Sequence, residues 1–153
     1  MFKSITYGSV TLEQMFNIIS KRLDDVNDYE IAVGTDSHSR RKSVIVTVVS
    51  VRIIGKGVFY FYLTKKQKRF NSLTHKIETE TYASIEVGTL VKEKMLEYGL
   101  DTEKLYIDLD MGNKGPTKDL LKHIIGWVMG VGFKYRIKPE AYSACRIADR
   151  RSK

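Results

Sequence analysis

Cysteine and proline are scarce in this chain, and the scarcity of cysteine excludes a class of protein. The 153 residues contain one cysteine, Cys145, and two prolines. A single cysteine excludes an intramolecular disulfide framework and favours a reducing compartment, so we expect a cytoplasmic location. Because Cys145 lies between the small residues Ala144 and Ala148, we interpret it as a packing residue rather than a nucleophile.

Membrane-spanning runs and zinc-ligand spacings are also missing. No stretch of 18 consecutive apolar residues occurs, and the N-terminus has no apolar leader, so we expect a soluble protein without a membrane partner. His75 and His123 have no ligand spacing with Cys145 or with each other, which argues against zinc.

Basic residues are the abundant component. Twenty-six lysines and arginines against 18 acids give a net charge of +8 and a pI near 9.5. Such a surplus favours a polyanionic partner, although each basic cluster could simply be a solvated surface. The residues that we expect to contact nucleic acid are Lys65, Lys66, Lys68, Arg69, Arg150 and Arg151.

Hydrophobic periodicity predicts one α/β domain over residues 1–153, with a helical N-terminal extension over 1–28 and a core over 29–153. A helix is expected over 11–26, where Thr11 and Gln14 form a capping box. Apolar runs predict strands at 31–36, 43–51 and 58–63, joined by short turns as an antiparallel meander. A long helix from 72 or 74 to about 98 follows. The remaining expected elements are a strand at 104–110, a helix at 117–128, a strand at 130–137 and a helix from Pro139 to Asp149. The order predicts a mixed five-stranded sheet with helices on both faces.

Acidic residues stand at the ends of several of these elements. Asp36 closes a buried strand, after which we expect the chain to break at Ser37–Ser39, and a buried carboxylate is costly unless something binds it. Asp108 and Asp110 close the fourth strand, and Asp149 ends the last helix. Carboxylates gathered at one sheet edge are typical of sites that hold two divalent cations for phosphodiester hydrolysis.

The long helix offers three acids, Glu78, Glu80 and Glu86. We favour Glu80, because it shares a face with Ser84 and lies early in the helix. Glu86 is six residues deeper, roughly 9 Å along the axis.

Each acid also has a simpler interpretation. Asp36 could form a turn or pair with Arg40, Asp110 could cap a turn over Gly112, and Asp149 could pair with Arg146 or Arg150. Two residues are possible auxiliaries: His38, which could orient a water or move a proton, and Thr117, which could present a phosphate site at a helix N-terminus.

Four segments carry a family resemblance: Val33-Gly-Thr-Asp-Ser-His38, the stretch from Asp108 to Thr117, Gly126 to Phe133, and Lys138 through Arg150. Together they resemble the YkuK-type family of the ribonuclease H-like superfamily. The resemblance implies an RNase H-like fold and suggests a metal-dependent nuclease. It assigns the strand-one acid to Asp36, the helix acid to Glu80, the strand-four acid to Asp108 with Asp110 as neighbour or replacement, and the last-helix acid to Asp149.

The sequence therefore predicts a nuclease that hydrolyses RNA or DNA, or an RNA–DNA hybrid, with two Mg²⁺ or Mn²⁺ ions held by Asp36, Glu80, Asp108, Asp110 and Asp149. The alternative is a non-catalytic nucleic-acid-binding module on the same fold. A third interpretation is a subunit whose basic face meets an acidic protein. Either a monomer or a homodimer is consistent with the sequence.

Overall fold

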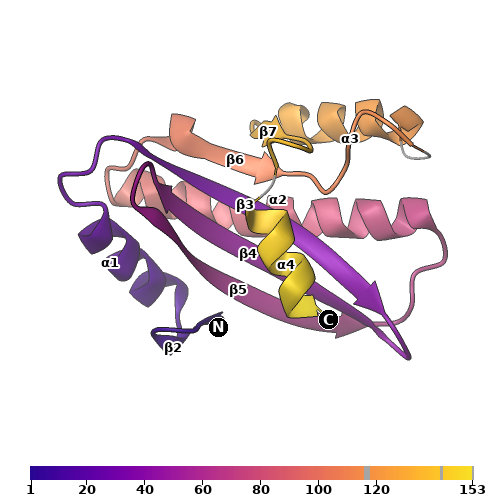
Figure 1. Ribbon diagram of the computed structural model, residues 1–153, viewed down its shortest axis with the longest axis horizontal. Coiled ribbons are helices and arrows are strands. Elements are labelled where there is room, and N and C mark those ends of the chain that lie inside the picture. The colour runs from indigo at the N-terminus through magenta and orange to yellow at the C-terminus, as the bar shows by residue number, and fades with distance from the viewer. Residues whose placement is uncertain (116–117, 142, 153) are drawn as a thin grey trace.

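The computed structural model describes residues 1–115, 118–141 and 143–152. Its centre is a seven-stranded sheet of order β2-β1-β5-β4-β3-β6-β7 (Figure 1). The long strands β3 (Tyr29–Ser39), β4 (Ser43–Ile53) and β5 (Gly57–Gln67) form the predicted antiparallel meander. The short strands β6 (Leu105–Asp108) and β7 (Lys134–Arg136) continue the sheet in parallel. The predicted mixed sheet is confirmed.

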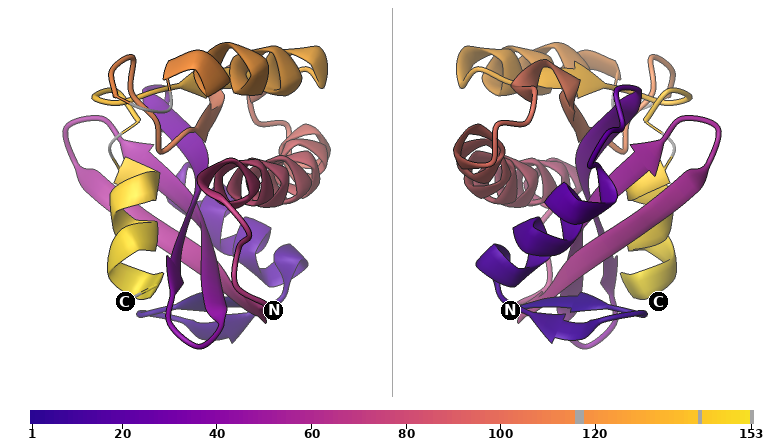
Figure 2. Two further views of the ribbon diagram at one scale, coloured as in Figure 1. Left: turned by 90° about the vertical axis from the view of Figure 1, so that its right-hand side faces the viewer. Right: turned by 90° about the vertical axis from the view of Figure 1, so that its left-hand side faces the viewer.

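Helices cover both faces of the sheet, also as predicted (Figure 2). The main core joins α1 (Leu12–Arg22), α2 (Leu73–Glu97) and α3 (Lys118–Gly130) to one face. The helix α4 (Ser143–Ser152) lies on the other face, where Ile147 and Ala148 pack on Ala32, Val46 and Val48. Residues of β3 alternate between the two faces. We call these the α2 face and the α4 face of the sheet.

The N-terminal segment departs from the predicted helical extension. The capping box is confirmed, because Thr11 Oγ1 accepts from the Gln14 N–H and Gln14 Oε1 accepts from the Thr11 N–H. The helix ends at Arg22, however, and before it lie β1 (Phe2–Ser4) and β2 (Gly8–Val10). This hairpin joins the sheet where Lys3 pairs with Tyr62, so it adds two strands to the five expected. Strands of three residues are too short to show a periodicity.

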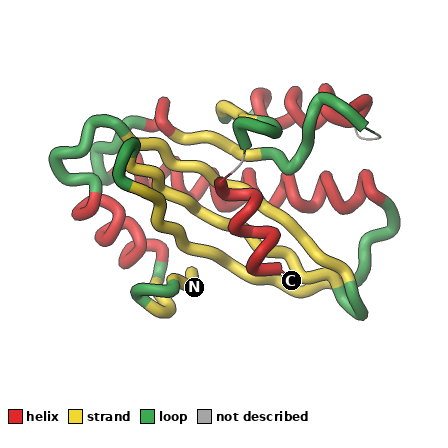
Figure 3. Tube along the Cα trace, viewed as in Figure 1, coloured by secondary structure: helices red, strands yellow, loops and turns green. Residues whose placement is uncertain are grey.

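The predicted break after Asp36 is wrong. β3 continues to Ser39, which pairs with Ser43, and the chain turns only at residues 40–42. β4 supplies the backbone partners that make this polar end a strand, and the Ser39 and Ser43 hydroxyls are hydrogen-bonded at 2.9 Å. β5 likewise runs on to Gln67, so Lys65 and Lys66 belong to a strand rather than to a basic loop. The β3–β4 turn and the β5–α2 connection lie at the same end of the sheet (Figure 3).

The long helix α2 is confirmed and begins at a Ser72 N-cap. Its buried face includes Ile77, Thr81, Ser84, Val91 and Met95. A Cβ added at Gly88 would lie 2.8 Å from Ile107 Cδ1, so the glycine allows α2 to pack closely against β6.

Three expected boundaries shift near the C-terminus. The strand expected from residue 130 begins at Lys134, because α3 continues to Gly130. The fourth strand ends at Asp108, after a short 3₁₀ turn over Thr102–Lys104, so Asp110 lies in the following loop. The last helix begins at Ser143 rather than Pro139, which follows a cis peptide bond. None of the helices in the described part of the chain is long and apolar enough to cross a bilayer.

Candidate functional site

Asp36 lies on β3 just beyond the point where the neighbouring strand β6 ends. The parallel ladder between β3 and β6 ends at the Gly34–Asp108 pair, two residues before Asp36. On its other side Asp36 pairs with Val46 of β4. The residue is 6% exposed, and its side chain points to the α4 face. Asp36 is therefore fixed by an 11-residue strand at the point where the neighbouring strand has ended.

Glu80 approaches this point from α2. It is buried, and its Oε2 accepts a hydrogen bond of 2.6 Å from Ser37 Oγ, the next residue of β3. The Lys76 ammonium, one helical turn earlier, donates to the same oxygen at 2.8 Å and lies 3.8 Å from Asp36 Oδ1. Lys76 thus bridges the strand acid and the helix acid. In the sequence it appeared only as one more cation in a basic stretch, although its spacing of four residues from Glu80 was visible.

The electrostatics show that carboxylates crowd around Asp36. Burial raises the pKa of Asp36 from its ordinary 3.8 to about 7, helped by the charges of Glu80 and Asp110 and by a hydrogen bond with Asp149. Lys76 acts in the opposite direction. Burial also raises the pKa of Glu80, against the lowering effect of Lys76. One ammonium therefore does not neutralise the charge that these acids bring together.

An open recess of about 510 Å³ connects Asp36 to solvent. Asp36, Asp110 and Asp149 line it, together with Lys138 and Arg146. We call it the acid recess. Asp110 pairs with Lys138 at 2.6 Å, and its side chain is 24% exposed.

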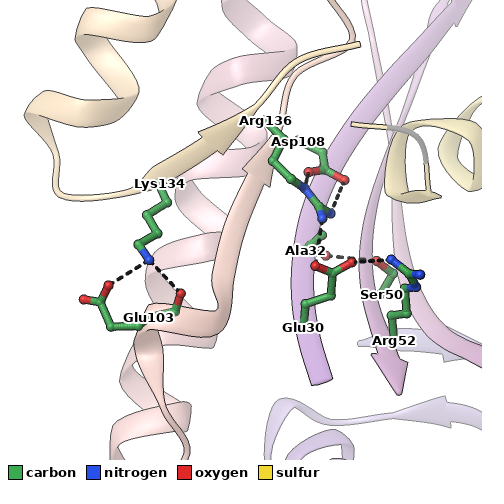
Figure 4. Close-up of polar contacts among 8 residues, drawn as sticks. All are labelled: Glu30, Ala32, Ser50, Arg52, Glu103, Asp108, Lys134 and Arg136. Carbon is green, nitrogen blue, oxygen red and sulfur yellow. Dashed lines mark hydrogen bonds and ion pairs between the residues drawn. The ribbon is translucent and has the colours of Figure 1, made fainter. Parts of the chain in front are cut away.

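Asp108, the expected strand-four acid, has a different environment from Asp110. Its side chain is fully buried, and its two oxygens accept hydrogen bonds of 2.8 and 3.1 Å from Arg136 of β7 (Figure 4). The parallel register explains the difference. Gly34 pairs with Asp108, so Asp110, two residues further along, is level with Asp36. The sequence could not show this, because it does not specify the register.

The other two helix acids have other partners. Glu86 pairs with Lys65 at 3.3 Å, and Glu78 lies 3.8 Å from His123 Nε2. Both side chains are about half exposed. Of the three candidates on α2, Glu80 is the one that contributes to the electrostatics of Asp36.

The remaining expected residues are distributed as follows. His38 is half-buried on β3, two residues beyond Asp36 and on the same face. Thr117 lies outside the described residues, and so does the side chain of Cys145. The basic residues fall into two regions: Lys65 and Lys66 at the end of β5 with Lys68 and Arg69 after it, and Arg150 and Arg151 on α4. Arg151 donates to the Tyr60 hydroxyl and lies over the rings of Tyr60 and Tyr62.

The donors of the acid recess fit a hard divalent cation. Carboxylate oxygens are the ligands that Mg²⁺ and Mn²⁺ prefer, and the Lys76 ammonium already provides a positive charge between Asp36 and Glu80. Within the described ranges, no group of three or more His, Cys, Asp or Glu side chains is arranged to hold a metal ion.

The fold is a mixed sheet with helices on both faces, and acids gather beside its first long strand. The comparison with known families agrees with this arrangement. The family model described as Ribonuclease H-like matches residues 12–153, and the chain belongs to that family. More particularly, the chain is similar to the "Uncharacterized protein YkuK" of Bacillus subtilis (strain 168), with 26% identity over an alignment of 170 residues. The alignment covers 100% of this chain and 97% of the relative. No solved structure gives a significant match. The family resemblance predicted from the sequence motifs is confirmed.

Proposed function

We propose that this protein is a divalent-metal-dependent nuclease that hydrolyses phosphodiester bonds of RNA or DNA. The observation that carries the proposal is the convergence on Asp36 of three further acids from separate parts of the fold: Glu80, Asp110 and Asp149. A protein gains nothing in stability from such repulsion, so a bound cation is the natural reason for it.

The proposed ligands of two Mg²⁺ or Mn²⁺ ions are Asp36, Glu80, Asp110 and Asp149. Asp108 is assigned a supporting role, because Arg136 holds both of its oxygens. When bound, such ions supply Lewis-acid stabilisation of the phosphate and a water of lowered pKa.

The chain's own residues have separate tasks in this proposal. Ser37 donates to Glu80 and fixes the orientation of its carboxylate. Lys76 offsets part of the negative charge of Asp36 and Glu80 when the cations are absent, and it can turn toward solvent or phosphate when they bind. The basic residues at the end of β5 and on α4 hold the nucleic-acid backbone, which makes the affinity salt-dependent.

The test is cleavage of labelled single-stranded and duplex RNA and DNA, an RNA–DNA hybrid and a four-way junction, with Mn²⁺ or Mg²⁺. We expect the wild type to cleave at least one substrate and Asp36→Asn to lose at least a hundredfold in rate, since a metal ligand is removed. Asp24→Asn is the matched control, because Asp24 is an exposed acid after α1.

Two results would contradict the proposal. Either the wild type cleaves none of these substrates, or Asp36→Asn cleaves as fast as Asp24→Asn. Salt-sensitive binding without cleavage would instead support a non-catalytic nucleic-acid-binding module.

A further inference from the structure

Four arginines surround a second open recess on the α4 face of the sheet. The recess has a volume of about 560 Å³, which is within the range of small-molecule sites. Its arginines come from three elements: Arg52 from β4, Arg136 from β7, and Arg146 and Arg150 from α4. We call it the arginine recess.

Glu30 of β3 organises the floor of this recess. Its two oxygens accept from Arg136 Nη1 at 3.0 Å and from Arg52 Nη1 at 3.1 Å (Figure 4). Although burial opposes the effect, hydrogen bonds from Arg136 and then Arg52 hold the pKa of Glu30 below its usual value. One carboxylate therefore fixes two guanidinium groups, and the Arg52 side chain remains 51% exposed.

The helix α4 supplies the wall. Arg146 and Arg150 are four residues apart, so they project from the same side of the helix. Both are exposed and line the recess, and Arg151 lies apart from them over Tyr60 and Tyr62. The sequence grouped Arg150 with Arg151, whereas the fold gives them different surroundings.

The charge of the recess favours an anion. The acids that line it are Glu30 and Glu140, and Asp108 lies behind Arg136. The four arginines still outnumber these three acids. Guanidinium groups present paired N–H donors that match the oxygens of a phosphate, and they stay charged at any physiological pH.

The arginine recess adjoins the candidate active site at one residue. Arg146 lines both the arginine recess and the acid recess, which contains Asp36, Asp110 and Asp149. The two recesses therefore lie on either side of Arg146, close enough for one extended polyanion to contact both.

We propose that the arginine recess is a phosphate subsite for the nucleic-acid strand that enters the acid recess. The inference rests on the proposed function and deepens it, because it assigns the strand a path along α4. In this path Arg52, Arg146 and Arg150 contact phosphate, and Arg136 positions Asp108 and Glu30.

The experiment measures binding without metal, so that it is independent of cleavage. A fluorescein-labelled 12-nucleotide single-stranded RNA is titrated in EDTA over a range of salt concentrations, with wild type, Arg150→Gln and Arg52→Gln. We expect each variant to weaken binding about fivefold to tenfold and to reduce the slope of log affinity against log salt by about 0.7. Lys21→Gln is the matched control, because Lys21 is an exposed cation on α1, across the sheet. Its affinity should stay within about twofold of the wild type.

Arg150→Gln changes an exposed helix residue, so it tests the inference even if loss of the Arg52–Glu30 pair disturbs folding. Wild-type affinity in both arginine variants, or an equal loss in Lys21→Gln, would overturn the subsite, even if the protein cleaves RNA. Weakened binding in the arginine variants of a protein that cleaves nothing would support the subsite and contradict the nuclease.

Discussion

At the scale of single residues, the most informative group is the Asp36 carboxylate. Its pKa of about 7 means that the folded protein binds this proton far more tightly than the unfolded chain, whose value is near 3.8. Below pH 3.8 both states hold the proton, so the Asp36 carboxyl does not lower the free energy of unfolding. Between pH 3.8 and about 7 the unfolded chain gives up this proton while the folded state keeps it, so the free energy of unfolding falls as the pH rises through this range.

Asp36→Asn removes this cost. In EDTA we expect the variant and the wild type to unfold with similar free energies at pH 4, and the variant to be more stable at pH 7.5 by about 1–2 kcal/mol. This figure is well below the unscreened limit of about 4 kcal/mol for a shift of this size. Urea denaturation at the two pH values measures it. An advantage that does not grow with pH would contradict the assignment, and Asp24→Asn should show no such change.

The residue scale is also where the sequence predicted most. Asp36, Glu80 and Asp149 were chosen from their positions at element ends and on a helix face, and the fold brings them to one place. The distinction between Asp108 and Asp110 was not available, since it depends on the parallel register of β3 and β6 and on Arg136, which lies 28 residues away from Asp108 in the chain. Local patterns contain no information on such pairings.

At the scale of elements, the close packing of α2 against β6 is the feature to test. Gly88 faces Ile107 and the ring of Phe133, and an added Cβ would be too close to Ile107 Cδ1 at 2.8 Å. In Gly88→Ala, better helix propensity and the need for a small shift of Ile107 should nearly cancel. In Gly88→Val, the larger branched side chain should cost about 1–3 kcal/mol of unfolding free energy.

Thermal and urea denaturation of both variants provide the test. Glu93→Val, at an exposed position of α2, is the control for placing a branched residue in this helix. If Gly88→Val is as stable as Gly88→Ala, α2 is not held close to the sheet by this glycine.

Elements were predicted well where their periodicity is long and poorly where the pattern is short or polar. The long helix was found because its apolar periodicity extends over many turns, and the meander was found because the apolar parts of its three strands are clear, although each observed strand is longer than expected. The end of β3 was missed, because Ser37–His38–Ser39 has no apolar alternation and becomes a strand only through its pairing with β4. The three-residue strands β1 and β2 likewise depend on their partners.

At the scale of the whole molecule, the surplus of eight positive charges sets the response to salt. If the six expected basic residues each contact a phosphate, log affinity for single-stranded RNA should fall with log salt with a slope of about −4. Affinity would then drop more than about a hundredfold between 50 and 200 mM salt. Fluorescence anisotropy measures this slope. A slope near zero would argue against a polyanionic partner. An acidic protein would then be favoured as the partner only if a complex with one is found.

The short length of β6 has a consequence for how the two sides of the molecule communicate. Over most of the sheet, hydrogen-bonded strands separate the helix that carries Glu80 from the helix that carries Asp149. Because the β3–β6 ladder stops at the Gly34–Asp108 pair, β6 forms no barrier beside Asp36, and groups from both layers reach the same carboxylate. Two more residues of ladder would close this window and leave two half-sites with no common centre. The stopping point of one four-residue strand therefore decides whether acids from both layers can meet at Asp36.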